Sequence, residues 1–72
     1  MKRRVNGQWV DIPTDSSGRV DSDELRRAAG LPEDRALILH KQAGENEVVN
    51  PHAVITVDDG DAFSDAPLTV RG

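Results

Sequence analysis

The side chains best suited to metal binding or proton transfer are two histidines, His40 and His52. No third ligand stands at a suitable spacing from them, so a surface or capping role is expected for both. The run Asp58-Asp59-Gly60-Asp61 has the acidic composition of part of a calcium loop, but it lacks the later glutamate and the flanking helices, so a turn is expected. The serines lack a nucleophile elbow, and no glycine-rich phosphate loop is present. We therefore expect no catalytic residue, no bound metal and no cofactor.

The length and composition point to one small domain. The chain has 72 residues, of which 36% are apolar, and a formal net charge of −4. A domain of this size buries only about 60% of the surface that its unfolded chain exposes, so a thin core is expected. The absence of cysteine excludes disulfides and thiolate zinc sites and favours the cytoplasm. No apolar run approaches the roughly 20 residues of a membrane helix, and the acidic balance argues against nucleic-acid binding.

The charges are unevenly distributed. Residues 1–44 carry a net charge of +1, and residues 45–72 carry −5. The acidic segment is either a solvated loop or an electrostatic face for a basic partner.

A hairpin is predicted at the start of the chain. Asn6-Gly7 lies between two short runs, and this dipeptide favours a tight turn because both residues tolerate positive φ. After the turn, Val10 and Ile12 are expected to face the core, with Trp9 on the opposite, partly exposed side. Residues 14–19 are turn-forming and predict a loop.

A two-turn helix is predicted over residues 22–29. Asp21 can cap its N-terminus, with Glu24 at the third helical position as in a capping box. Gly30 suits the left-handed residue that follows a helix. The apolar face is expected to comprise Leu25, Ala28 and Ala29.

Short apolar runs predict the remaining strands. They cover residues 36–40, 47–49, 54–57 and 68–70. A turn of 3₁₀ helix is expected at residues 52–53, Phe63 is expected to fill the core after the turn at 58–61, and Ala66-Pro67 is expected to break the chain. A hairpin, one helix and further strands predict an α+β two-layer domain whose last strand returns beside the first.

Three stretches of the sequence resemble one family. Residues 5–10, residues 25–34 and residues 49–67 are similar, in order and spacing, to bacterial ubiquitin-like domains of the multiubiquitin type. The resemblance implies a β-grasp fold, with a mixed four- to five-stranded sheet and one short helix packed across it. It also implies a division into a domain over residues 1–67 and a last strand and tail over residues 68–72.

The end of the sequence resembles the tails of ubiquitin-like modifiers. The run ends in Arg71-Gly72, with a single glycine where most of these modifiers have two. The resemblance implies that the carboxylate of Gly72 is adenylated and joined to a target amine, and that Leu68, Val70 and Arg71 are read by the activating enzyme. The implied partners are an E1-like adenylating enzyme, an E2-like conjugating enzyme and a deconjugating metalloprotease.

Ubiquitin-like proteins are also recognised through an apolar patch on the open face of their sheet. If Leu37 and Leu39 point into the core, then the candidates for such a patch are Ile38, His40 and Val49, together with Val70. The alternative is that these side chains simply fill the thin core.

Three functional hypotheses remain open. The leading one is a modifier, without enzymatic activity of its own, that is conjugated through Gly72. The second is an interaction module that docks through its sheet and is never conjugated. The third is a sulfur carrier, which the single glycine makes less favourable because such carriers usually end in two glycines. Fold alone does not separate these hypotheses.

Overall fold

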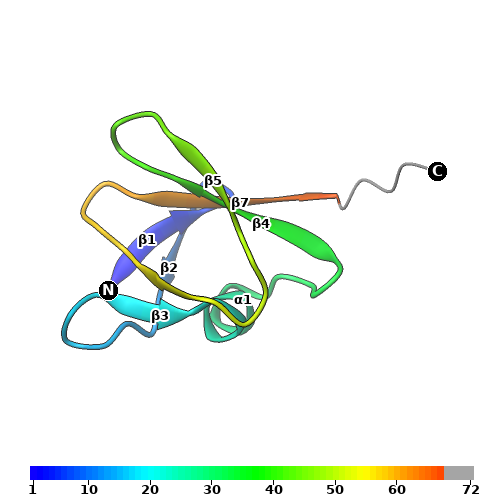
Figure 1. Cartoon of the computed structure of the whole chain (residues 1–72), viewed down its shortest axis with the longest axis horizontal. Helices are drawn as coiled ribbons and strands as arrows, with labels where there is room; N and C mark the ends of the chain where they lie inside the picture. The colour runs from blue at the N-terminus through cyan, green and yellow to red at the C-terminus, as the bar shows by residue number, and fades with distance from the viewer. Residues whose placement is uncertain (68–72) are drawn as a thin grey trace.

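The computed structural model describes residues 1–67 as one small domain (Figure 1). Its elements follow the order β1 (Lys2–Val5), β2 (Gln8–Asp11), β3 (Arg19–Asp21), α1 (Ser22–Ala29), β4 (Arg35–His40), β5 (Asn46–Val49), β6 (Val54–Thr56) and β7 (Ala62–Pro67).

Five of the strands form a mixed sheet. Its order is β2-β1-β7-β4-β5, so the last described strand lies in the middle. The pair β1–β7 is parallel, and the other neighbouring strands are antiparallel. The expected α+β domain with a mixed sheet and one helix is therefore confirmed. The strand beside β1 is β7, whereas the last strand predicted from the sequence, residues 68–70, lies outside the described residues. In addition, β3 and β6 form a separate antiparallel pair that the sequence did not predict.

The opening hairpin follows from its turn. Asn6 and Gly7 have φ of 52° and 81°, the left-handed values that the Asn-Gly dipeptide permits. The Asn6 side chain also reaches β7, where its Nδ2 donates to Asp65 Oδ1 at 2.8 Å. Asp65 forms an ion pair with Arg35 at the start of β4. One carboxylate therefore joins the hairpin turn, the central strand and β4.

Helix α1 has the predicted limits, and its caps explain them. The Asp21 side chain accepts from the Asp23 backbone N–H at 2.8 Å, and Gly30 takes a left-handed φ of 70° while its N–H donates to carbonyls of the last turn. The predicted apolar face is partly wrong, because Ala28 is exposed. The helix instead buries Leu25 together with Ser22, which donates to the Asn50 carbonyl at 3.0 Å.

Arg26, in the last turn of α1, is a buried charged residue. Its Nη1 donates to the carbonyls of Pro32, at 3.2 Å, and Arg35, at 2.6 Å. A buried guanidinium needs such acceptors because desolvation without hydrogen bonds is costly. Arg26 thereby fixes the connection from α1 to β4.

The core lies between the sheet and the layer formed by α1 and the β3–β6 pair, and Figure 1 shows α1 and β3 below β4, β5 and β7. Phe63 of β7 is 2% exposed and pairs in register with Val5 on one side and Leu39 on the other. The buried apolar residues are Val5, Ile12, Val20, Leu25, Leu37, Leu39, Val49, Val57 and Phe63.

Three further expectations need correction. Residues 14–19 are not all loop, because Arg19 begins β3 through its pairing with Thr56. Residues 51 and 52 form a turn rather than a 3₁₀ helix, with His52 at a φ of 61°. Ala66 and Pro67 do not break the chain but complete β7, where Pro67 pairs with Arg35 at the end of the strand. The predicted strand at 68–70 lies outside the described residues.

The cap at Asp21 generates a stability prediction. Asp21→Ala removes the acceptor for the Asp23 N–H and should lower the free energy of unfolding by about 1 kcal/mol. Asp21→Asn keeps a side-chain oxygen that can accept this hydrogen bond, so it should retain most of the wild-type stability. Urea denaturation measures the difference, with exposed Ser16→Ala as the control. An Asp21→Ala midpoint equal to that of Ser16→Ala would show that the cap does not stabilise the helix.

The Asp65 carboxylate generates a prediction for acid. Its hydrogen bond from Asn6, followed by the bond and charge of Arg35, lowers the pKa of Asp65 below its usual value of 3.8. A lowered folded-state pKa gives stability that is present above the unfolded-state pKa and is lost as the pH falls through the folded-state pKa. The stability of the wild type and of Asp65→Asn is compared from neutral pH to about pH 2. Below about pH 4, acidification should lower the stability of the wild type more than that of Asp65→Asn.

The control for this acid titration is Asp34→Asn, because Asp34 is exposed and forms no ion pair within residues 1–67. Thermal unfolding at each pH provides the measurement. A wild-type curve parallel to that of Asp65→Asn would contradict the assigned role of Asp65.

Candidate functional site

The candidate site is the outer face of the five-stranded sheet, which is the face opposite the core. Strand alternation and register place one set of side chains there. They are Lys2 and Arg4 of β1, Trp9 and Asp11 of β2, Ala36, Ile38 and His40 of β4, Asn46 and Val48 of β5, and Ala62, Ser64 and Ala66 of β7. We call this set the outer face.

Of the four predicted patch residues, Ile38 and His40 lie on the outer face, and Val70 lies outside the described residues. Val49 does not lie on the outer face, because it pairs with Leu37 on the core side and is only 5% exposed. The expectation for Val49 is thus corrected. Val48, which pairs with Ile38 and is 67% exposed, takes its place. In Asn-Glu-Val-Val the two valines are adjacent, so the sequence pattern did not determine which of them faces outward.

His40 lies in a hydrogen-bonded group on this face. Its Nδ1 lies 2.7 Å from Asn46 Oδ1, and its Nε2 lies 2.7 Å from Ser64 Oγ. Asn46 Oδ1 accepts hydrogen bonds only, so Nδ1 carries a proton in this arrangement. These two contacts connect the ring to Asn46 of β5 and to Ser64 of β7.

Trp9 and Arg4 form an exposed cross-strand pair on the outer face. They are direct cross-strand partners, and the Arg4 guanidinium carbon lies 5.2 Å from the centre of the Trp9 ring. Trp9 is nevertheless 64% exposed. At an exposed site a cation–π contact contributes about 0.5 kcal/mol, so it orients the two side chains without burying them.

The outer face carries positive charge in an acidic protein. Lys2 and Arg4 form no ion pair within residues 1–67. Asp11 is the one acidic side chain at an outward position of these five strands, and its Oδ1 lies 2.9 Å from the N-terminal amine. The outer face is therefore basic, although the whole chain has a net charge of −4.

The predicted tail residues lie outside the described part of the chain. They are Leu68, Val70, Arg71 and Gly72. The last described residue, Pro67, is exposed and belongs to the central strand β7.

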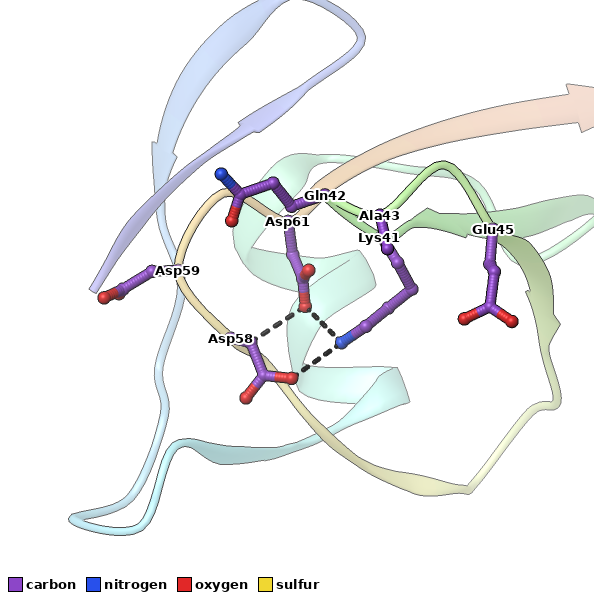
Figure 2. A pocket seen from close by; sticks show the side chains of 7 residues that line it. All are labelled: Lys41, Gln42, Ala43, Glu45, Asp58, Asp59 and Asp61. Atoms are coloured by element: carbon purple, nitrogen blue, oxygen red, sulfur yellow. Dashed lines mark hydrogen bonds and ion pairs between the residues drawn. The ribbon is translucent and has the colours of Figure 1, made fainter.

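A second cluster, which sequence reasoning missed, surrounds Lys41. Lys41 Nζ lies 2.8 Å from Asp58 Oδ2 and 2.8 Å from Asp61 Oδ2 (Figure 2). The Asp58 backbone N–H donates to the same Asp61 oxygen at 2.8 Å. The Asp61 side chain is 1% exposed, so Lys41 neutralises a buried charge beside an open pocket of about 360 Å³. Turn composition alone could not predict this, because Lys41 is distant in sequence.

The Lys41 cluster stabilises the fold and does not supply a nucleophile. The two carboxylates raise the pKa of Lys41 above its usual value, chiefly through the hydrogen bond to Asp58 and then the bond to Asp61. A protonated amine is not a nucleophile, so Lys41 is poorly suited to attack an acyl group. The acidic run at residues 58–61 is thus a turn, with its buried aspartate neutralised by a lysine.

The two histidines are engaged separately. His52 contacts Asp23 through Nδ1, whereas His40 contacts Asn46 and Ser64. Within residues 1–67 no group of three or more His, Asp or Glu side chains is arranged to hold a metal ion.

Comparison with known proteins does not identify a family. No family model matches the chain, and no curated protein or solved structure matches it either. No helix among the described residues is long and apolar enough to cross a membrane.

The Lys41 cluster generates a stability prediction. Lys41→Met leaves the buried Asp61 carboxylate without its cation and should lower the free energy of unfolding by about 2 kcal/mol. Adding Asp61→Asn should restore part of this loss, because the amide oxygen can still accept from the Asp58 N–H. Chemical denaturation of both variants measures this coupling.

The matched control is Lys2→Met, at an exposed lysine without an ion pair in the described part of the chain, and it should change stability by no more than about 0.5 kcal/mol. Equal effects of Lys41→Met and Lys2→Met would refute the cluster's role.

Proposed function

We propose that this protein is a ubiquitin-like modifier of β-grasp fold, activated at Gly72 and joined to amines of target proteins. The observation that carries the proposal is the strand order β2-β1-β7-β4-β5, with a parallel central pair and one helix on the core side. This arrangement is compatible with a β-grasp. We also propose a cytoplasmic location, as expected from the sequence.

The position of β7 supports a role for the tail. The strand is paired on both sides, with β1 and β4, as far as Phe63, and with β4 alone up to Pro67. In the sequence, the tail residues therefore follow the strand that lies in the middle of the sheet. A terminal glycine suits an activating enzyme because it lacks Cβ and allows close approach of the backbone to a nucleotide.

A modifier supplies a carboxylate and a docking surface, and its partners supply the catalysis. The implied partners are an E1-like adenylating enzyme, an E2-like conjugating enzyme and a deconjugating metalloprotease. The exposed outer face offers these proteins a mixed surface of apolar and basic groups, with Ile38 and Val48 near one edge and Trp9 at the other.

The two lysines differ as acceptors in self-conjugation. An amine must lose its proton before it attacks a thioester. Lys41 is held protonated by Asp58 and Asp61, whereas Lys2 is exposed and forms no ion pair within residues 1–67. If the modifier forms chains through a lysine, Lys2 is the favoured acceptor.

A second candidate function is a docking module that is never conjugated. The solvent-exposed Trp9 favours it, because exposed tryptophan and arginine are enriched among residues that dominate protein–protein binding energy. A third, the sulfur carrier, would use the same terminal carboxylate as a thiocarboxylate.

Mass spectrometry of the protein expressed with its neighbouring genes separates the three functions. The wild-type chain should yield a covalent adduct between Gly72 and a protein amine, and a chain lacking Gly72 should yield none. A chain extended by one residue beyond Gly72 serves as a second variant, because it blocks the same carboxylate without shortening the tail.

The other outcomes are equally specific. Replacement of one oxygen by sulfur at the terminal carboxylate would indicate the carrier. Unmodified protein that retains the same partners with and without Gly72 would overturn the modifier and favour the docking module. Thermal unfolding should be the same for all variants, because changes at a chain terminus are generally well tolerated.

A further inference from the structure

We propose that the groove beside Trp9 and Arg4 binds an acidic, apolar peptide segment of a partner protein, with a carboxylate on Arg4 and an apolar side chain against Trp9. The groove lies at the end of the sheet where β1 passes the turn that leads into β7. It has a volume of about 260 Å³ and is lined by Arg3, Arg4, Trp9, Gly60, Asp61 and Ala62.

Arg4 is the charged group that remains available in this groove. Arg3 pairs with Asp59 at 2.9 Å, and Asp61 pairs with Lys41 at 2.8 Å. Arg4, in contrast, contacts the Trp9 ring and forms no ion pair among residues 1–67. A guanidinium presents its N–H groups as a planar fork that matches a carboxylate. The stacked Arg4 is also partly ordered before binding, which lowers the entropic cost of complex formation.

Trp9 supplies the apolar half of the site. Trp9 is 64% exposed, whereas Phe63, the other of the two residues of type Phe, Trp or Tyr in the sequence, is buried. Ala62 lies directly across β1 from Trp9 and is small, so the groove has an apolar floor beside the indole. An apolar partner side chain placed there would bury both surfaces.

The charge distribution selects the partner. Lys2 and Arg4 make this end of the outer face basic, whereas the chain as a whole is acidic. A segment with single, spaced carboxylates complements the two basic groups. Within the lining of the groove, Arg4 is the basic group without an ion-pair partner among residues 1–67, which matches one carboxylate rather than the continuous charge of a phosphate backbone, so a peptide is favoured.

Trp9, the single tryptophan, allows a direct test with the untagged full chain. The probe is a short acetylated peptide in which aspartate and glutamate alternate with leucine and phenylalanine. Saturable binding should shift Trp9 fluorescence to shorter wavelength and should weaken as salt is added. Arg4→Gln should weaken binding by about tenfold.

The matched control is Arg27→Gln, which removes the same charge from an exposed position on α1. It should change binding by less than about twofold if a local contact rather than net charge governs the interaction. Backbone amide spectra of both variants verify that the fold is retained. This inference does not depend on conjugation of Gly72, so the two proposals can fail separately.

Four outcomes would overturn the inference. They are absence of saturable peptide binding, equal losses for Arg4→Gln and Arg27→Gln, equal binding of a peptide with lysine in place of its acidic residues, and tighter binding of a single-stranded oligonucleotide. Concentration-dependent self-association abolished by Arg4→Gln would instead assign the groove to a second copy of the chain.

Discussion

The fold depends on the burial of one face of β7 between β1 and β4. Phe63 is 2% exposed and has Val5 and Leu39 as its register partners, so the central strand joins the opening hairpin to the second half of the sheet. Burying an aromatic side chain contributes about 2 kcal/mol, a large share of the stability expected for so small a domain. Leu25 of α1 and Val20 of β3 complete the core on that side. Because one short helix and one strand pair can cover only one face, the other side of the sheet is left as a surface.

Polar contacts at the margins of the core hold the sheet in this arrangement. Asp65 connects the hairpin turn with β4, Arg26 fixes the chain between α1 and β4, and Lys41 neutralises the buried Asp61. In each of these contacts, the charged side chain has its partner on the core side of the sheet or at the end of a strand. Lys2 and Arg4 are left on the outer face without ion-pair partners in residues 1–67, which is why this face is basic in an acidic chain.

The sequence predicted the features that depend on local chemistry. Asn6-Gly7 specified the hairpin, and Asp21 and Gly30 delimited the helix. Alternation put Leu37 and Leu39 on one face and Ile38 and His40 on the other, but it left open which face is buried. Sequence reasoning failed where pairing between distant segments decides the outcome. The β3–β6 pair, the start of β7 at Ala62 and the phase of Val48 and Val49 all depend on register. The Lys41 cluster likewise forms only after β4 and the turn at residues 58–61 are brought together.

Docking of a partner on the sheet requires that the outer face is open to solvent in the 72-residue chain. Methyl relaxation by a dissolved, uncharged paramagnetic probe tests it directly, because relaxation falls steeply with distance from solvent. For the dilute 72-residue protein, we expect the methyl groups of Val48 to relax strongly and those of Ile38 to relax clearly. The methyl groups of Leu37 and Leu39 should be little affected. Protection of Val48 and Ile38 equal to that of Leu37 would contradict an open outer face, because some part of the chain would then cover the surface on which binding depends.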